Sequence, residues 1–199
     1  MSILLLDVAL IGGGYAVGSI ATAILVARAL GLGDPRQSGS GNPGATNILR
    51  IGGKKAALLT LLGDLIKGVV PIVIARLLGL EDWALAAVAL ATFLGHLYPV
   101  FFGFRGGKGV ATALGILLAL LPVLGLSILG MWILVFAVTR VSSMAALLAA
   151  VSAVPIVFAV SSATSMRVLI MVLVLLILWR HRSNIRRLLD GSERPFKKH

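Results

Sequence analysis

Two polar segments rich in glycine interrupt an otherwise apolar chain. The first occupies residues 39–47 with the sequence GSGNPGATN, and the second occupies residues 103–112 with the sequence GFRGGKGVAT. Glycine leaves backbone amides exposed, and exposed amides beside Arg or Lys side chains are well suited to bind phosphate oxygens. The two segments therefore predict phosphorylated substrates, provided that the fold brings both of them to one site.

Candidate binding groups come from these two segments and from a third, basic one at residues 180–187 with the sequence RHRSNIRR. The first segment and the residues just after it contribute Ser40, Gly41, Asn42, Thr46, Asn47 and Arg50. The second contributes Arg105, Gly106, Gly107, Lys108, Gly109 and Thr112. In the third, His181 and Asn184 lie three positions apart and so share one face of a helix. His96 lies near the same surface, close to the end of a preceding apolar run.

Each of these features also has a structural explanation. Glycine-rich loops between membrane helices can be tight turns, and the arginines of the third segment can anchor the end of a span. A single interfacial histidine is more often structural than catalytic. The second segment is not a Walker A loop, because Phe102 and Gly109 stand where that motif has Gly and Ser or Thr. ATP binding is therefore not expected.

Asp64 and Lys67 are two charged residues inside an apolar run, three positions apart. Ionisable groups at that depth in a membrane are costly, and they are usually paired or functional. We expect an intrahelical or loop-bracing pair here in preference to a direct contact with substrate.

The composition indicates whether the protein folds in water or in a membrane. Hydrophobic residues make up 59% of the chain and charged residues 13%, with a mean hydropathy of +1.05, which is typical of an integral membrane protein. The 199 residues suffice for one helical bundle, so we expect a single transmembrane domain over residues 1–199. The chain has no cysteine, and no carboxylate cluster or nucleotide motif calls for a metal or another cofactor.

Six apolar runs can supply membrane spans, which need about 20 residues each. They occupy residues 3–27, 56–80, 83–102, 110–138, 144–160 and 166–179. The run at 110–138 is long for one span and short for two, and Pro122 and Gly125 punctuate its middle. The first run is expected to be a span and not a cleaved signal peptide, because it carries Asp7 and lacks an early basic stretch.

The distribution of basic residues decides the number of spans. If residues 110–138 form a hairpin of two short helices, the chain has seven spans, and four segments holding 15 of the 18 Lys and Arg residues face one side. The positive-inside rule then predicts an outside N-terminus and a cytoplasmic C-terminus. It also explains most of the net charge of +11, so no nucleic-acid partner is expected. The expected fold is an all-α bundle of about seven transmembrane helices, with all three polar segments on the cytoplasmic face.

The motifs resemble the three signature segments of the bacterial acyl-phosphate glycerol-3-phosphate acyltransferases, the PlsY family. The segment GSGNPGATN followed by Arg50, then GHLYPVFFGFRGGKGVAT, then RHRSNI, occur in the family's order, and the resemblance covers essentially the whole chain. Pro43 is a mild departure, and the loop at residues 140–143 matches only approximately. Either Ser142 or Ser143 therefore takes the role of the family's serine, and we prefer Ser143.

The resemblance implies a reaction. The acyl chain of acyl phosphate moves to the primary hydroxyl of sn-glycerol 3-phosphate, which gives 1-acylglycerol 3-phosphate (lysophosphatidic acid) and inorganic phosphate in the first step of phospholipid biosynthesis. The expected partners are glycerol 3-phosphate, acyl phosphate and membrane lipids, at the cytoplasmic side of the bacterial inner membrane. The residues give no prediction of oligomeric state.

The resemblance also implies roles for individual residues. The catalytic set would be Ser40, Arg50, His96, Lys108 and His181. Phosphate oxygens would be held by Ser40, Asn42, Arg50 and Lys108, with amides of Gly41 and of the four residues Gly106, Gly107, Lys108 and Gly109. The pocket would be completed by Thr46, Asn47, Arg105, Thr112 and Ser143. His181 and Asn184 would position glycerol phosphate.

No Ser-His-Asp order, cysteine nucleophile or His-x-x-x-x-Asp motif is present, since Phe101 and Arg186 stand where the last motif needs Asp. Direct transfer without an acyl-enzyme is therefore expected, and the hydroxyl proton passes either to substrate phosphate or to a histidine.

Two other classes of protein stay open at this point. A membrane transporter of phosphorylated anions would also use basic loops, although interrupted helices meeting near the midplane would be expected. A lipid-binding scaffold could use the basic tail at residues 194–199, but it would not explain the two glycine-rich segments.

Overall fold

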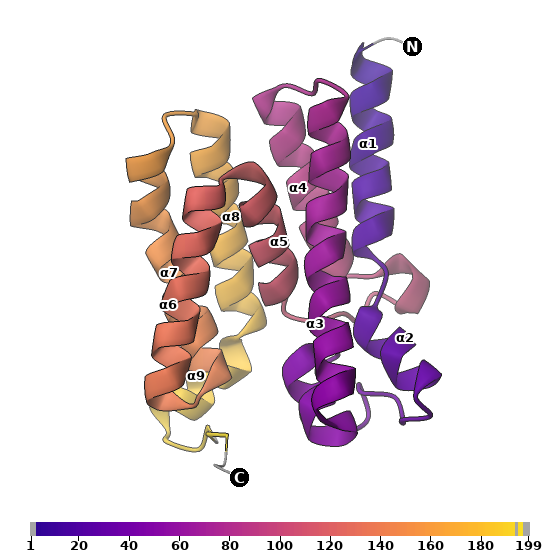
Figure 1. Ribbon diagram of the computed structural model, residues 1–199, viewed down its shortest axis with the longest axis vertical. Coiled ribbons are helices and arrows are strands. Elements are labelled where there is room, and N and C mark those ends of the chain that lie inside the picture. The colour runs from indigo at the N-terminus through magenta and orange to yellow at the C-terminus, as the bar shows by residue number, and fades with distance from the viewer. Residues whose placement is uncertain (1–2, 194, 197–199) are drawn as a thin grey trace. The chain divides into compact units, whose positions relative to one another are not determined.

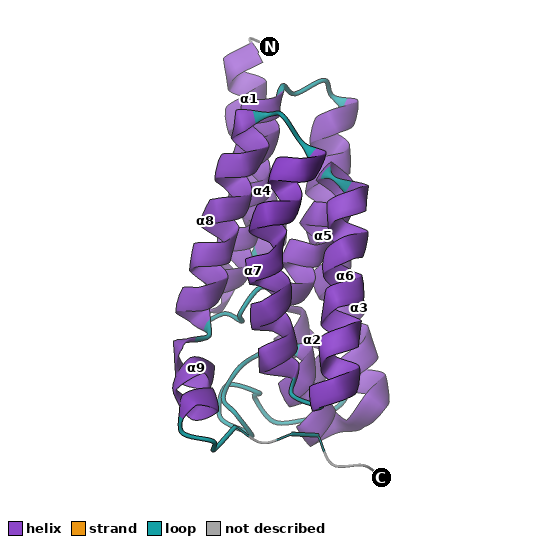
Figure 2. Cartoon of the chain, turned by 90° about the vertical axis from the view of Figure 1, so that its left-hand side faces the viewer, coloured by secondary structure: helices purple, strands orange, loops and turns teal. Residues whose placement is uncertain are grey.

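The computed structural model describes residues 3–193 and 195–196, and every regular element in that part of the chain is a helix (Figures 1 and 2). The helices are α1 Ile3–Gly18, α2 Thr22–Ala29, α3 Ala45–Leu77, α4 Asp82–Leu97, the short 3-10 helix η1 Val100–Phe102, α5 Val110–Leu120, α6 Pro122–Thr139, α7 Ser142–Val160, α8 Thr164–Arg180 and α9 Arg182–Leu189. Four helices are long and apolar enough to cross a membrane, and the number rises to six if each of two bent pairs is one span. The predicted all-helical class is confirmed, whereas seven spans and their orientation stay predictions.

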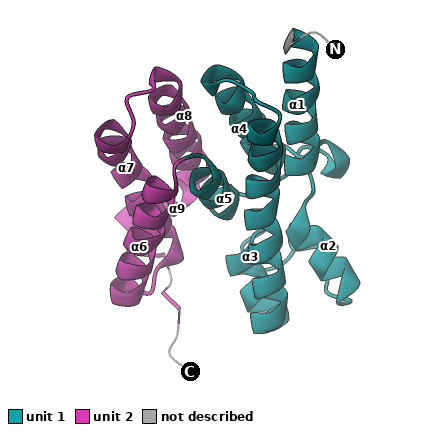
Figure 3. Ribbon diagram, turned by 45° about the horizontal axis from the view of Figure 1, so that its top comes forward, with its two compact units in different colours: residues 1–120 teal, residues 121–199 magenta. Residues whose placement is uncertain are grey.

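The chain forms two compact units, residues 1–120 and residues 121–199 (Figure 3). Their boundary divides the long apolar run at 110–138 into α5 and α6, as its punctuation predicted. Leu121 precedes a proline and leaves the helical region of backbone space. Pro122 is favourable at the first turn of α6, because its missing amide proton has no partner to bond there.

In the first unit, α1 and α4 approach so closely that only glycine fits at their crossing. A Cβ atom at Gly18 would lie 2.0 Å from the carbonyl oxygen of Thr92. The hydroxyl of Tyr15 in α1 donates a hydrogen bond to the carbonyl of Tyr98, just beyond α4, at 2.7 Å. Small residues permit such contacts between membrane helices. The crossing therefore holds α1 against the end of α4 that carries His96.

The first apolar run is not one continuous helix. It breaks at residues 19–21, and α1 and α2 are bent by 41° at this point. A broken helix in a membrane must find partners for the backbone groups that leave the helical hydrogen-bond pattern. The carbonyl of Ile20 accepts a hydrogen bond of 2.7 Å from Lys67 Nζ. The run at residues 3–27 is therefore a bent pair of helices, and its break is stabilised by a residue 47 positions away. That it forms the first span stays a prediction.

A second close crossing joins α3 to α5. A Cβ atom at Gly68 would lie 2.3 Å from the carbonyl oxygen of Thr112. The middle of α3, which carries Asp64 and Lys67, therefore lies directly against the first turn of α5.

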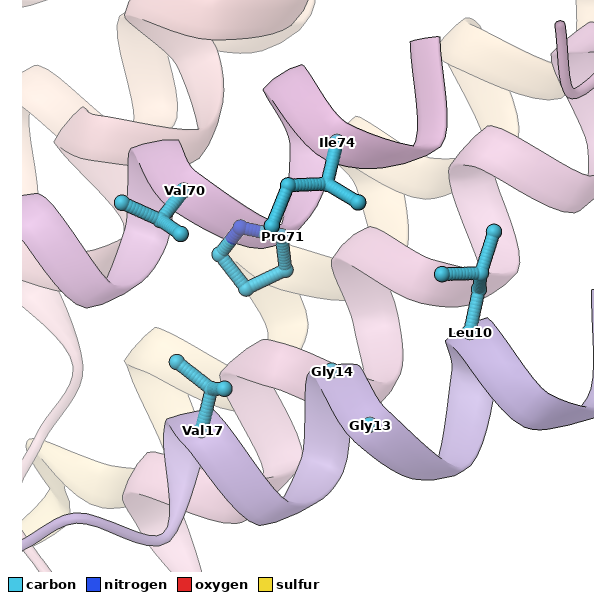
Figure 4. Close-up of a pocket in the computed structure, with 7 residues that line it drawn as sticks. All are labelled: Leu10, Gly13, Gly14, Val17, Val70, Pro71 and Ile74. Atoms are coloured by element: carbon cyan, nitrogen blue, oxygen red, sulfur yellow. The ribbon is translucent and has the colours of Figure 1, made fainter. Parts of the chain in front are cut away.

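An apolar pocket of about 130 Å³ lies between α1 and α3 (Figure 4). It is lined by Leu10, Gly13, Gly14, Val17, Val70, Pro71 and Ile74. None of these residues belongs to the polar segments, so this pocket is not the predicted substrate site.

In the second unit, α7 packs against both α6 and α8, with alanine as its main buried residue type. The C-terminal segment then folds back on the loop between α6 and α7. The amide of Phe196 donates a hydrogen bond of 2.9 Å to the carbonyl of Arg140. The ring of Phe196 meets that of Phe136 edge to face, with centroids 5.7 Å apart. The Arg140 loop and the C-terminal segment thus lie at the same end of this unit.

Candidate active site

Both glycine-rich segments lead directly into the N-terminus of a helix. In the first segment, Gly44 caps the N-terminus of α3. In the second, Gly109 immediately precedes α5. Unbonded amides and the helix dipole make such ends favourable for anions. Thr46, Asn47 and Arg50 therefore lie in the first two turns of α3. Their polar character hid the start of the helix.

The two segments contact each other inside the first unit. A Cβ atom at Gly107 would lie 3.1 Å from the carbonyl oxygen of Pro43. A second link lies nearby, where Arg36 Nη1 donates a hydrogen bond of 2.8 Å to the carbonyl of Phe102. The two glycine-rich segments are therefore close enough to contribute to one site in this unit.

Arg36 is held in place by Asp34, a pair that sequence reasoning missed. Arg36 Nε and Nη2 lie 3.0 and 2.7 Å from the two carboxylate oxygens of Asp34. The side-chain hydrogen bond from Arg36 lowers the pKa of Asp34, and the same bond raises the pKa of Arg36. The spacing of an acid and an arginine two positions apart, just before the first segment, was the available signal.

Asn47 braces the first segment from within. Its Oδ1 accepts a hydrogen bond from the Ser40 amide at 2.8 Å, and its Nδ2 donates to the carbonyls of Pro35 and Ser38 at 2.9 Å each. Gly39 adopts a φ of +63°, and a Cβ atom there would lie 2.2 Å from Asn47 Oδ1. Asn47 is only 1% exposed, so the structure shows it positioning the segment, and its direct contact with substrate stays a prediction.

The residues that this brace holds are accessible. Ser40, Gly41 and Arg50 are exposed, and Asn42 and Thr46 are partly buried. These residues lie at the surface around the start of α3.

The first two glycines of the Gly-Gly-Lys-Gly sequence pack the second segment onto the end of α4. The amide of Gly106 donates to the Leu97 carbonyl at 3.2 Å, and that of Gly107 donates to the His96 carbonyl at 3.3 Å. A Cβ atom at Gly106 would lie 2.0 Å from the His96 carbonyl oxygen. These two amides thus bond the protein's own carbonyls, whereas Arg105 is exposed and Lys108 is partly buried at the surface of the segment.

His96 and Thr112 form a buried contact beneath this segment. Thr112 Oγ1 lies 3.0 Å from His96 Nδ1, and the two residues are 0% and 6% exposed. Thr112 therefore supports His96, and its contact with substrate stays a prediction.

In the second unit, His181 and Asn184 lie at the bend between α8 and α9, which measures 62°, and Ser143 at the start of α7 is linked to Asn184 through Glu193. His181 Nδ1 lies 2.8 Å from the Ile177 carbonyl oxygen, and since a carbonyl only accepts, Nδ1 carries the proton. Ser143 Oγ and Asn184 Nδ2 both donate to Glu193 Oε1 at 2.5 Å.

Glu193 is a partly buried acid that joins these side chains and that sequence reasoning missed. Arg187 Nε lies 2.5 Å from its Oε2. Burial opposes ionisation of Glu193, but hydrogen bonds from Ser143, Asn184 and Arg187 outweigh it and lower its pKa. Its place as one of two acids, Asp190 and Glu193, in a basic tail was the available signal for it. Ser143, the preferred serine, contacts this carboxylate. That the residue groups of the two units share one site stays a prediction.

The family model for glycerol-3-phosphate acyltransferases matches residues 8–191. The glycerol-3-phosphate acyltransferase of Thioalkalivibrio sulfidiphilus is 55% identical over 190 residues, which cover 96% of this chain and 94% of the relative. That of Methylobacillus flagellatus is 57% identical over 185 residues, which cover 92% and 94%.

Two crystal structures of PlsY, an integral membrane glycerol 3-phosphate acyltransferase, have the same fold. The glycerol 3-phosphate form matches with a TM-score of 0.92 and 41% identity over 96% of both chains. The lysophosphatidic acid form matches with a TM-score of 0.89 and 40% identity over 96% of this chain and 95% of that one. The resemblance drawn from the motifs is confirmed: this multi-pass membrane protein belongs to the PlsY family of glycerol-3-phosphate acyltransferases.

Proposed function

We propose that the protein transfers an acyl group from acyl phosphate to the sn-1 hydroxyl of glycerol 3-phosphate. The products are 1-acylglycerol 3-phosphate and inorganic phosphate. The observation that carries this proposal is the contact between Pro43 and Gly107, which joins two glycine-rich segments that each lead into a helix N-terminus. The related PlsY structures in glycerol 3-phosphate and lysophosphatidic acid forms support the acceptor and the product.

The proposed site binds two phosphate groups, one from each substrate. The N-termini of α3 and α5 provide two anion-binding ends, and Arg50, Arg105 and Lys108 add positive charge beside them. Ser40, Gly41 and Asn42 contribute polar groups at the start of α3. In the second unit, His181 and Asn184 stay predicted ligands of glycerol phosphate, and a single domain over residues 1–199 stays a prediction.

The reaction is a single displacement. The acceptor hydroxyl oxygen attacks the acyl carbonyl carbon, the bond between that carbon and the phosphate oxygen breaks, and phosphate leaves with the electron pair. The hydroxyl proton passes either to the phosphate or to His96 or His181. Acyl phosphate is a mixed anhydride with a good leaving group, so the protein's main task is to orient both substrates and stabilise charge on the carbonyl oxygen. Ser143 donates a hydrogen bond to Glu193. Asn184 and Arg187 bind the same carboxylate and the pKa of Glu193 is lowered, so it is a weak base for activating this serine as a nucleophile.

The proposed topology has seven spans, an outside N-terminus and a cytoplasmic active site in the bacterial inner membrane. The shared position of the Arg140 loop and the C-terminal segment supports it, because seven spans require both on one side of the membrane. Acyl phosphate would enter from the bilayer and glycerol 3-phosphate from the cytoplasm.

The test is an assay of purified protein with acyl phosphate and glycerol 3-phosphate. We expect 1-acylglycerol 3-phosphate and phosphate in equal amounts, and none with acyl-coenzyme A as the donor. Product formed with acyl-coenzyme A alone would overturn the proposed donor. Uptake of glycerol 3-phosphate by proteoliposomes without acylation would instead favour the transporter.

A further inference from the structure

The first unit contains a buried ion pair that the proposed reaction does not use. Asp64 and Lys67 of α3 are 3% and 5% exposed, and Lys67 Nζ lies 2.8 Å from Asp64 Oδ1. Burying two charges costs several kcal/mol each in order of magnitude, and a well-packed apolar pair is often at least as stable. An apolar α3 would span the membrane without them, so the pair calls for an explanation beyond stability.

On one side, the pair is tied to the break in the first span. Lys67 Nζ donates to the Ile20 carbonyl at 2.7 Å, which is one of the groups freed where α1 ends and α2 begins. Lys67 therefore connects α3 to the segment that leads into the first glycine-rich loop.

On the other side, the pair faces His96. Asp64 Oδ1 lies 3.6 Å from His96 Nδ1, beyond hydrogen-bond distance but close enough for its charge to act on the ring. Among the described residues, this oxygen is a buried acceptor without a well-aligned hydrogen bond, although Lys67 lies 2.8 Å away. A buried acceptor without a well-aligned hydrogen bond is costly, so its presence calls for a structural or functional explanation. A carboxylate accepts but does not donate, so it favours the imidazole form with its proton on Nδ1.

The opposite edge of the ring touches the second glycine-rich segment. A Cβ atom at Gly107 would lie 2.4 Å from His96 Nε2. The form favoured by Asp64 leaves a lone pair on Nε2, on the side of this segment. Thr112 Oγ1, 3.0 Å from Nδ1, fixes the ring orientation.

We infer that Asp64 and Lys67 are positioning residues that hold His96 in the Nδ1-protonated form and direct Nε2 at the Gly107 segment. The inference rests on the proposed acyl transfer. Asp64 acts through the ring of His96, and Lys67 acts by keeping Asp64 charged and in place. Neither residue contacts substrate.

The test compares single and double neutral variants. Asp64→Asn and Lys67→Met each leave one buried charge unpaired and should lower thermal stability. The double variant D64N/K67M removes both charges and should recover stability. We expect its kcat to stay reduced by about tenfold to a hundredfold, as for a displaced catalytic group, with KM for glycerol 3-phosphate changed less than kcat. Arg76→Met is the matched control, because Arg76 also lies in α3 and donates to backbone carbonyls of α5, at Ala119 and Leu120.

A second measurement does not depend on activity. Nitrogen NMR of protein labelled at histidine, with the His96 signals assigned through His96→Gln, should show one Nδ1-protonated form in the wild type. D64N/K67M should show a mixture of forms. The two measurements can also disagree. If the wild-type protein shows no acyl transfer but the His96 signals still change in D64N/K67M, the proposed function is rejected and the positioning role is kept.

A folded double variant with wild-type kcat and unchanged His96 signals would overturn the inference. If the double variant does not fold, Asp64→Glu takes its place, because it keeps the charge pair and moves the carboxylate by one methylene. We expect Asp64→Glu to fold with a lower kcat and shifted His96 signals, and wild-type values for both would equally overturn the inference.

Discussion

The hydroxyl of Ser143 donates a hydrogen bond to the carboxylate of Glu193, fifty positions later in the chain. Because Asn184 and Arg187 bind the same carboxylate, one acid joins the start of α7, the first turn of α9 and the C-terminal segment. Two of these donors, Ser143 and Asn184, were predicted to bind substrate. In the structure they organise their own unit through an internal anion.

Replacement of Glu193 by glutamine should destabilise the second unit. Loss of the charge weakens the bonds from Ser143, Asn184 and Arg187, and a hydrogen bond to a charged group is worth about 1.5–3 kcal/mol. Thermal unfolding in detergent should show a lower midpoint for Glu193→Gln. The matched control is Asp190→Asn, since Asp190 is exposed and its carboxylate accepts only from Ser192 among the described hydrogen bonds. Equal midpoints for both variants and wild type would contradict the role of Glu193.

The same carboxylate predicts how stability depends on pH. The pKa of Glu193 is lowered from its ordinary value of 4.5 in the folded protein, so its contribution is complete above the unfolded pKa and is lost as pH falls through the folded pKa. Wild-type protein should lose stability on acidification below about pH 4.5, and Glu193→Gln should lose less over the same range. Parallel pH curves for the two proteins would reject this linkage.

Replacement of Lys108 by alanine should lower turnover without unfolding the protein. Its ammonium lies on the second glycine-rich segment, where a charge-assisted bond to phosphate is worth about 1.5–3 kcal/mol, or about tenfold to a hundredfold in rate. Initial rates with both substrates varied would measure the effect. Lys55→Ala is the control, because Lys55 is exposed further along α3. A folded Lys108→Ala protein with normal activity would leave Lys108 as a topology anchor only.

Cysteine labelling should place the Arg140 loop and the C-terminal segment on one side of the membrane. The natural chain has no cysteine, so single cysteines at Ser142 and Ser192 can be labelled without background. Both should react from the cytoplasmic side, and Ser162→Cys, in the loop between α7 and α8, should react from the other side. Labelling of Ser142→Cys and Ser192→Cys from opposite sides would rule out seven spans.

Kinetics should be sequential, with both substrates bound before acyl transfer. Radiolabelled acyl phosphate alone should leave no acyl group on the protein, because the proposed mechanism transfers the acyl group directly and uses no protein nucleophile. The decisive contrary result is an ester on Ser40 or Ser143 that transfers to glycerol 3-phosphate, which would make that serine the nucleophile.

The sequence predicted those parts of the fold that depend on local composition. Apolar runs indicated helices, Pro122 marked the division between α5 and α6, and the glycine-rich segments identified the family. Close spacing in sequence also indicated the Asp64–Lys67 pair.

The missed features depend on contacts between distant residues. The break at residues 19–21 is stabilised by Lys67, and the Glu193 contacts bring together residues up to fifty positions apart. Asn47 shows a second limit: an amide suits a ligand and a backbone carbonyl equally well, so residue type could not reveal that its donors and acceptor are used inside the loop.

The packing of Gly106 and Gly107 against α4 has a consequence for protein engineering. An added methyl group at Gly106 collides with the backbone at His96, so an alanine scan of this loop would displace the loop and weaken affinity even where no ligand contact was removed. Weakened affinity in such a scan is thus ambiguous evidence for amide contacts with phosphate. Attempts to alter substrate preference should vary the side chains of Arg105 and Lys108 and leave both glycines unchanged.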